Sequence, residues 1–246
     1  GSPMIPLSVL GGLRRELIRQ LDESSTARPA RQIAESSALT ALQATLPSRD
    51  SDTESARQKS RKPELRVLCR SLTQLGTTLE AGVSSVMVDF QDIREYRQAV
   101  EIAHAAAAEI FIATPRIQKP DEAGIFRALQ KHDADGILVR NLAGLRYYTA
   151  AGIRVVADFS LNIANELTAQ YLIDQGAERV TASYDLNRDQ LLDLVQATPP
   201  SWMEVVIHQH MPMFHMEHCV FCAVLSPGTN KHNCGRPCDD HIVELR

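Results

Sequence analysis

The sequence lacks several features that mark common protein classes. No apolar run approaches the roughly 18 residues of a membrane-spanning helix, so no membrane span is expected. There are 26 lysine and arginine residues against 30 aspartate and glutamate residues, and this net charge of −4 gives no global basic field for non-specific nucleic-acid binding. Aromatic residues make up only 5% of the chain. Its plentiful aliphatic residues instead favour a layered α/β core.

Several catalytic and cofactor-binding motifs are also missing. No Gly-x-Gly-x-x-Gly follows the first predicted strand, which argues against a dinucleotide-binding sheet. No His-Glu-x-x-His occurs, and no Ser–His–Asp or Cys–His pattern has a recognisable protease spacing. Only five cysteines are present, and four crowd into residues 219–238 instead of being scattered as in a disulfide framework. We therefore expect a reducing, cytoplasmic location with metal-bound thiolates.

Composition divides the chain into four segments. Residues 1–46 show helical periodicity, and residues 47–63 are polar with almost no apolar side chain, as in a linker. Residues 64–214 alternate short β-rich runs with amphipathic stretches, and residues 215–246 hold most of the cysteines. The chain is thus predicted to contain an N-terminal helical segment, a linker, a barrel-like domain and a metal-binding segment.

The alternation predicts seven parallel strands joined by helices. One continuous β/α series favours a TIM-barrel-like array, which is incomplete because a closed barrel has eight strands. Glycines at positions 82, 136, 152 and 176 fall between predicted helices and strands and are expected in left-handed helix caps. The predicted strands are Leu65–Arg70, Ser85–Phe90, Glu109–Thr114, Gly136–Arg140, Arg154–Phe159, Arg179–Tyr184 and Met203–His208.

In such barrels, catalytic groups lie at the carboxyl ends of strands. Arg140, Asp158, His208 and His210 occupy these positions and are the candidates for lining a substrate pocket. A polar residue at a strand end is more often a helix cap or a solvated loop residue, so the set carries more weight than any single member. The other polar residues at these ends are Arg70, Asp89, Asn141, Ser160, Asn162, Tyr184 and Asp185.

The strongest chemical signal lies near the end of the sequence. Cys219 and Cys222 form a C-x-x-C pair, and Cys234 and Cys238 form a C-x-x-x-C pair. Thiolates at these spacings can wrap one soft metal centre, and spacing alone favours zinc and an iron–sulfur cluster about equally. Cys69 lies alone near the first strand, and a small buried side chain is the better interpretation for it.

At these residues the sequence resembles peptidase family U32, the collagenase-like peptidases. The matching stretch runs from Met216-Glu217-His218-Cys219 through Leu225-Ser226 to Cys234-Gly235-Arg236-Pro237-Cys238. Ile5-Pro6-Leu7-Ser8 with Arg14-Arg15-Glu16 also resembles a family segment. The resemblance implies a TIM-barrel-like fold and a [4Fe–4S] cluster on Cys219, Cys234 and Cys238. Many members have a cluster cysteine where this chain has Pro212, so the fourth ligand is Cys222 or a cysteine beyond Arg246.

The resemblance also implies a choice of functions. Characterised members support hydroxylation of tRNA or rRNA bases, or of a ubiquinone precursor, and this is the first hypothesis. A metal-dependent collagenase-like peptidase and a zinc-stabilised, non-catalytic scaffold are the alternatives. The expected partners are tRNA or rRNA, together with a second copy of the chain or a further part of the same full-length protein. Because seven strands leave an open barrel edge, we expect the chain to dimerise or its amino-terminal helix to cover the gap.

Overall fold

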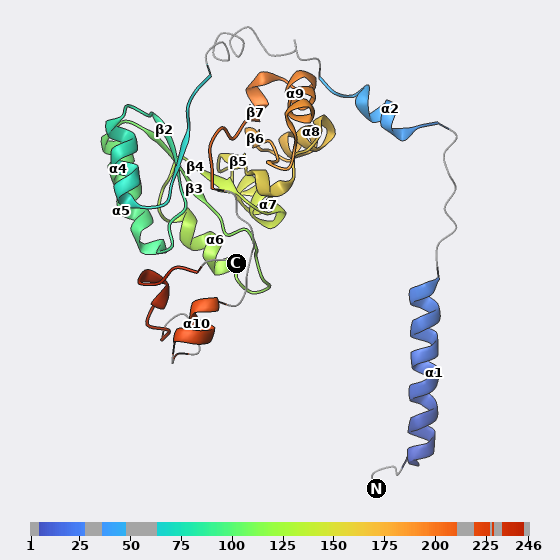
Figure 1. The fold of residues 1–246 in the computed structure, drawn as a ribbon. Coiled ribbons are helices and arrows are strands. Elements are labelled where there is room, and N and C mark those ends of the chain that lie inside the picture. Colours follow the sequence, from blue (N-terminus) through green and yellow to red (C-terminus); the bar gives the residue numbers. More distant parts are fainter. Residues whose placement is uncertain are drawn as a thin grey trace.

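The computed structural model of the protein describes residues 5–27, 36–47, 63–210, 219–226, 228 and 233–243. An N-terminal helix, α1, spans Leu7–Thr26, and a short helix, α2, spans Ala38–Gln43. Neither has a buried residue, and Figure 1 shows α1 apart from the rest of the molecule. No helix in the described part of the chain is long and apolar enough to cross a membrane. Most of the predicted linker, residues 48–62, lies outside the described residues.

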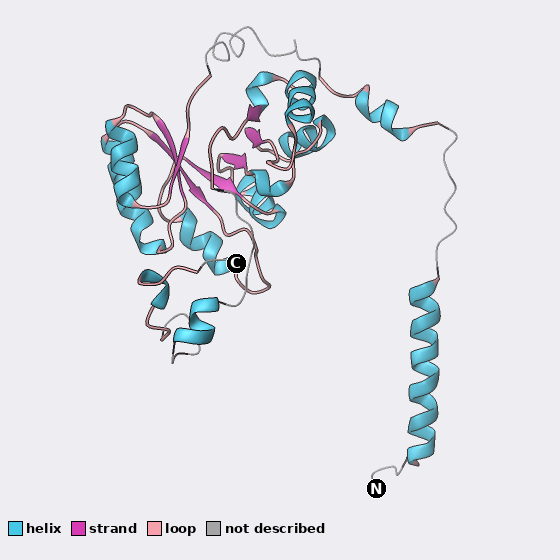
Figure 2. Ribbon diagram, viewed as in Figure 1, coloured by secondary structure: helices cyan, strands magenta, loops and turns pink. Residues whose placement is uncertain are grey.

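Seven parallel strands form one sheet in strict sequence order from β1 to β7, with helices around them (Figures 1 and 2). Within the described residues, this is the order of a β/α barrel that lacks one strand for closure. The strands are β1 (Val67–Cys69), β2 (Ser85–Val88), β3 (Glu109–Ala113), β4 (Gly136–Val139), β5 (Val155–Ala157), β6 (Arg179–Thr181) and β7 (Met203–Glu204). The incomplete TIM-barrel-like fold predicted from the sequence is therefore confirmed.

The connecting elements are mostly α-helices with short 3-10 turns. Each of the seven predicted strands is present, but the strands are shorter than predicted because their last residues turn into loops or helix caps. The connections are α4 (Leu72–Glu80), η2 (Ile93–Glu95), α5 (Tyr96–Ala105), α6 (Ala123–Gln130), α7 (Leu142–Ala150), η3 (Phe159–Leu161), α8 (Glu166–Asp174), α9 (Arg188–Ala197) and η4 (Pro200–Trp202). After β7 come α10 (Val220–Leu225) and η5 (Pro237–Asp239).

The two faces of the sheet build different cores because side chains alternate along each strand. On the outer face, residues such as Val86, Ile110 and Val155 pack with helix residues such as Leu75 and Tyr148 in the main hydrophobic core. On the inner face, a smaller apolar layer fills the middle of the barrel. This layer consists of Met87, Phe111, Ala113, Leu138 and Val156.

Ion pairs occupy the inner face at the amino ends of the strands. Glu204 in β7 accepts a hydrogen bond from Nε of Arg179 at 2.8 Å and lies 3.3 Å from Nη1 of Arg66, which precedes β1. Arg154 lies over the Phe111 ring, 5.3 Å from its centroid. The contact between Arg66 and Glu204 joins the first and last strands across the interior, so the sheet curls back on itself although no described strand closes it.

Residues in the left-handed backbone conformation end several of the helices. The prediction that glycines take these positions is confirmed for three of the four. Gly82, Gly152 and Gly176 have φ values of 84°, 70° and 99°. The prediction for Gly136 is wrong, because this residue begins β4 and has no positive φ. A Cβ at Gly136 would lie 2.3 Å from Cε1 of Phe111, so the glycine makes room for that ring. The left-handed residue before β4 is instead Asp133, with φ 57°.

Candidate functional site

Charged side chains meet at the carboxyl ends of the strands. Oδ2 of Asp89, after β2, accepts hydrogen bonds from Nη1 of Arg140 at 2.8 Å and from Nη1 of Arg70 at 2.6 Å. Arg140 also contacts a second aspartate, because its Nε lies 3.5 Å from Oδ2 of Asp158. Arg70 and Asp89 follow neighbouring strands, as do Arg140 and Asp158, and residues at one level of such strands point to the same face, whereas the contact between Asp89 and Arg140 reaches across β3. The structure therefore brings together Arg140 and Asp158, two of the four residues that the sequence proposed for the pocket.

Arg140 is the buried centre of this cluster. Its exposed fraction is 8% and that of Asp158 is 3%. Although Nε of Arg140 is within ion-pair distance of Asp158, it has no hydrogen-bond partner in the described structure. A buried donor without an acceptor costs about 1–3 kcal/mol, so the nearby charge of Asp158 is what offsets the burial of this part of the guanidinium.

A pocket of about 240 Å³ opens beside Arg140. Phe159 and Tyr184 meet edge to face with their ring centroids 4.8 Å apart. The guanidinium of Arg116 lies over the Phe159 ring, with Cζ 5.0 Å from its centroid. Two arginines and two aromatic rings around one cavity suit a flat aromatic ligand that carries hydrogen-bond acceptors. The pocket is lined by Arg116, Ile117, Arg140, Phe159, Ser160, Asn162 and Tyr184.

Several residues at the strand ends act as helix caps, which is the common role of polar residues at such positions. Oδ2 of Asp158 accepts from the backbone N–H of Ser160 at the start of η3, at 3.4 Å. The Asn141 side chain accepts from the backbone N–H of Gly144 at 2.7 Å and caps α7. The Ser160 hydroxyl donates to the backbone oxygen of Arg140 at 3.1 Å. Asp158 therefore has two roles, since it caps η3 and faces Arg140.

The two candidate histidines lie elsewhere. His208 and His210 follow β7, and their ring centroids are 6.2 Å apart. Both are exposed, and neither is among the described residues that line the pocket. The structure thus groups the histidines with each other and not with Arg140 and Asp158.

The cysteine segment gathers its thiols around Cys222. The backbone N–H of Cys222 donates to the sulfur of Cys219, which lowers the pKa of the Cys219 thiol. Desolvation and the neighbouring thiols of Cys219 and Cys234 raise the pKa of Cys222 to about 11. Cysteine binds a soft metal as the thiolate, so these thiols would have to lose their protons on ligation.

The fourth cysteine of this segment is in η5, which packs against α10 (Figure 1). Sγ of Cys238 lies 4.0 Å from Oδ1 of Asp239. Cys234 is buried, while Cys222 and Cys238 are half-buried. Among the described residues, no three histidine, cysteine or acidic side chains already surround a common metal position. The donor types and the contacts of Cys222 nevertheless fit a thiolate-bound metal. Cys69 is buried away from this segment, in the main core.

Arg116, Ile117 and Phe159 are the pocket residues that the sequence did not single out. Arg116 follows β3 by three residues, so its position in a loop after a strand was the available signal. Phe159 ended a predicted strand and was assigned to the apolar pattern. Its contact with Tyr184 depends on the turn of η3, which the hydrophobic pattern does not show.

The fold and the site define a β/α half-barrel with an arginine-rich aromatic pocket at the carboxyl ends of its strands and a separate cysteine segment. The model of peptidase family U32 matches residues 82–241, which is more than half of the chain. The chain therefore belongs to this family.

Comparison with solved structures finds distant neighbours. The U32 peptidase Mk0906 is 14% identical, with a TM-score of 0.47 over 59% of this chain and 69% of its own. The YdjI aldolase from Escherichia coli K12 is 13% identical, with a TM-score of 0.45 over 60% and 66%. A glycerol uptake operon antiterminator-related protein from Thermotoga maritima is 13% identical, with a TM-score of 0.38 over 58% and 94%. No curated protein matches the sequence.

Proposed function

We propose that this chain is an iron–sulfur enzyme, or part of one, that supports hydroxylation of an RNA base or a similar aromatic acceptor. The gathering of the Cys219 and Cys234 thiols around Cys222 is the observation that carries the proposal. Cys219, Cys222, Cys234 and Cys238 would hold the cluster, with zinc as the alternative occupant. When bound, a [4Fe–4S] cluster supplies electron transfer at a potential that the protein tunes.

The residues of the pocket would bind and orient the acceptor ring. Phe159 and Arg116 offer an aromatic face and a guanidinium plane for stacking, as proteins use for unpaired bases. Arg140, which lines the pocket, would donate from its guanidinium to a ring carbonyl oxygen. Asp89 and Asp158 hold the Arg140 guanidinium in place from two sides.

A peptidase is the alternative that the family name raises. Peptide hydrolysis needs an activated nucleophile or water with a general base in reach. None of the seven described residues that line the pocket is a histidine, a cysteine or a carboxylate. The pocket therefore favours binding of an aromatic ring over cleavage of a peptide, and we expect no proteolysis of gelatin or casein, with or without zinc.

The open side between β1 and β7 bears on the partner. In the described structure, neither strand has a neighbour on its outer side. Because unpaired strand edges invite pairing, we propose that a second copy of the chain or a further part of the full-length protein covers them.

The test is the hydroxylated nucleoside and quinone content of a strain that lacks the full-length gene. Loss of one hydroxylated base, or of a quinone made without oxygen, supports the proposal. A gene that carries both Phe159→Ala and Arg116→Gln should fail to restore the lost modification. A gene that carries Tyr171→Ala, at an exposed tyrosine of α8, should restore it. Unchanged nucleosides and quinones, or peptide cleavage that disappears in a His208→Ala or His210→Ala variant, would contradict the proposal.

A further inference from the structure

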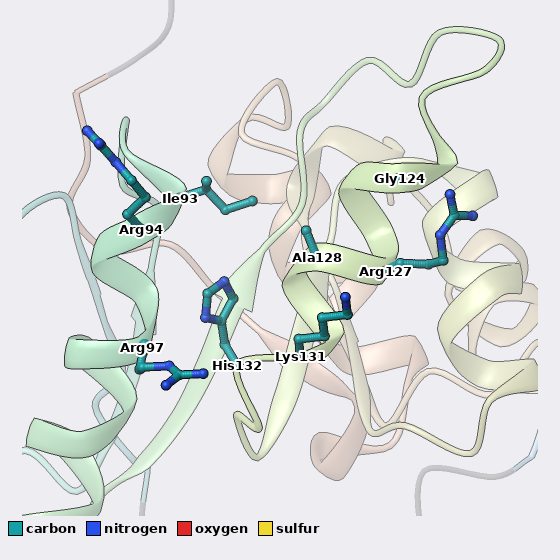
Figure 3. A pocket seen from close by; sticks show the side chains of 8 residues that line it. All are labelled: Ile93, Arg94, Arg97, Gly124, Arg127, Ala128, Lys131 and His132. Carbon is teal, nitrogen blue, oxygen red and sulfur yellow. The ribbon is translucent and has the colours of Figure 1, made fainter.

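A second cavity lies on the outside of the barrel, between α5 and α6. It is a groove of about 400 Å³, and Figure 3 shows Ile93 and Ala128 facing each other across it with His132 between the helices. This groove is distinct from the pocket beside Arg140, with which it shares no lining residue. It is lined by Ile93, Arg94, Arg97, Gly124, Arg127, Ala128, Lys131 and His132.

Cationic residues border the groove although the whole chain is acidic, while the surface of the groove itself is mostly apolar. Four of its eight described lining residues are arginine or lysine, and none is a carboxylate. Arg94 is paired with Asp92 through hydrogen bonds to both carboxylate oxygens. In the described structure, no carboxylate lies within ion-pair distance of Arg97, Arg127 or Lys131. Three unneutralised cations therefore gather on a chain whose net charge is −4.

Helix geometry sets these cations in two rows. Arg94 in η2 and Arg97 in α5 are three residues apart, and Arg127 in α6 and Lys131, the residue that follows α6, are four residues apart. Residues at these spacings lie about 5–6 Å apart on one face of a helix. In Figure 3, Arg97 points toward His132, whereas Lys131 points away from it and Arg94 and Arg127 lie at the outer flanks. Repeated cations along two walls match a ligand with repeated negative charges.

The chemistry of the groove floor limits the kind of polyanion. Burial, together with the positive charge of Arg97, lowers the pKa of His132, so this imidazole is neutral near pH 7. Apart from His132, no described lining residue is aromatic, and Ile93 is the only large apolar one. A protein partner would call for aromatic or large apolar anchors, and base readout would call for stacking rings. Cations without such anchors suit a phosphate backbone, which proteins contact for positioning.

Short connections along the chain join the groove to the candidate site. Asp89, which holds Arg140, lies four residues before Ile93, and Arg116 of the pocket lies eight residues before Gly124. Both connections leave the carboxyl ends of the strands, β2 and β3, and enter the first turns of the helices that form the groove. A strand of nucleic acid held in the groove could therefore lead toward the pocket.

We propose that the groove between α5 and α6 binds the phosphate backbone of an RNA and positions it on the outside of the barrel. That this RNA is the one modified at the pocket rests on the function proposed above. The binding itself does not depend on the cluster or on the chemistry at the pocket.

Fluorescence anisotropy of a labelled RNA hairpin with the full chain tests this proposal. The double variant Arg97→Gln, Lys131→Gln removes two groove cations. The control Arg146→Gln, Arg188→Gln removes two exposed cations on α7 and α9 and changes the net charge equally. At about 0.1 M salt, each lost phosphate contact weakens binding roughly five- to eightfold, so the groove variant should bind on the order of 30-fold more weakly. Its slope of log K against log salt should fall by about 2.

The control variant should keep wild-type affinity and slope, and a Cys234→Ser variant should still bind the hairpin. Equal losses in the groove and control variants would overturn the proposal, as would no loss in either or no RNA binding by the wild type. Poly-glutamate that binds the groove more tightly than the hairpin would also overturn it, in favour of an acidic protein partner. An unchanged nucleoside profile in the deletion strain with RNA binding intact would contradict the hydroxylase function and leave the groove assignment standing.

Discussion

Arg140 is the residue on which the site depends most. It is buried, lies between two aspartates and lines the pocket. Its neighbours in these contacts come from different strands and loops. Asp89 also has Arg70 as a partner, whereas Arg140 is the arginine that faces the more deeply buried Asp158. Removing Arg140 would therefore leave a buried carboxylate without its cation.

Replacing Arg140 by alanine should lower the free energy of unfolding by about 3 kcal/mol, because an unpaired charge buried in a protein is strongly destabilising. Arg70→Ala removes an arginine from the same cluster, but its side chain is 65% exposed. This control should cost about 1 kcal/mol or less. Urea denaturation followed by circular dichroism measures both. Equal losses for the two variants would show that Arg140 is not the buried centre of the cluster.

At this scale the sequence predicted the rim better than the pocket. Arg140 and Asp158 were identified because strand ends can be read from the β/α rhythm. Arg116 and Phe159 were not, because their contact joins the loop after β3 to the turn after β5. The same rhythm placed His208 and His210 at the end of β7, but it could not show that they remain outside the pocket.

The helix ends show how the elements are joined. The turn after α5 places Ala107 in the left-handed region with φ 54°. At the corresponding turns after α4 and α7, the left-handed residues are Gly82 and Gly152. A left-handed alanine is strained by contact of its Cβ with the backbone, at a cost of about 1–2 kcal/mol. The chain therefore carries avoidable strain at this exposed turn.

Ala107→Gly should raise the free energy of unfolding by about 0.5–1 kcal/mol, since relief of the strain exceeds the added entropy of the unfolded chain. Ala105→Gly is the matched control, because Ala105 is exposed and ends α5 in a helical conformation. That variant should lose up to about 1 kcal/mol. Thermal denaturation of the two variants separates the cases, and a loss of stability in Ala107→Gly would show that this turn is not strained.

All seven strands followed from the sequence because each is a short β-rich run between helical patterns. Their lengths did not follow, since residues such as Arg140 and Asp158 continue the pattern while their side chains serve a loop or a cap. Gly136 was misassigned for a related reason. Its role is to make space for Phe111 on the neighbouring strand β3. The two residues are 25 positions apart, and periodicity along the chain does not reveal such a contact.

The whole molecule combines a half-barrel with a cysteine segment. The ion pair between Arg66 and Glu204 holds the ends of the sheet across the interior, and the pocket lies at the opposite ends of the strands. The family model matches residues 82–241, which include strands β2 to β7 and most of the cysteine segment, so it covers both parts as one unit. The central claim is that this unit holds an iron–sulfur cluster on its clustered thiols.

The most direct test is the iron, sulfide and zinc content of the full chain, purified and reconstituted without oxygen, together with its visible spectrum. We expect a brown protein with about four iron and four sulfide per chain and little zinc. Cys234→Ser should lose most of the iron, whereas Cys69→Ser should keep it, because Cys69 is buried in the main core. A colourless wild type that holds zinc, or a Cys234→Ser variant with full iron and sulfide, would contradict the assignment.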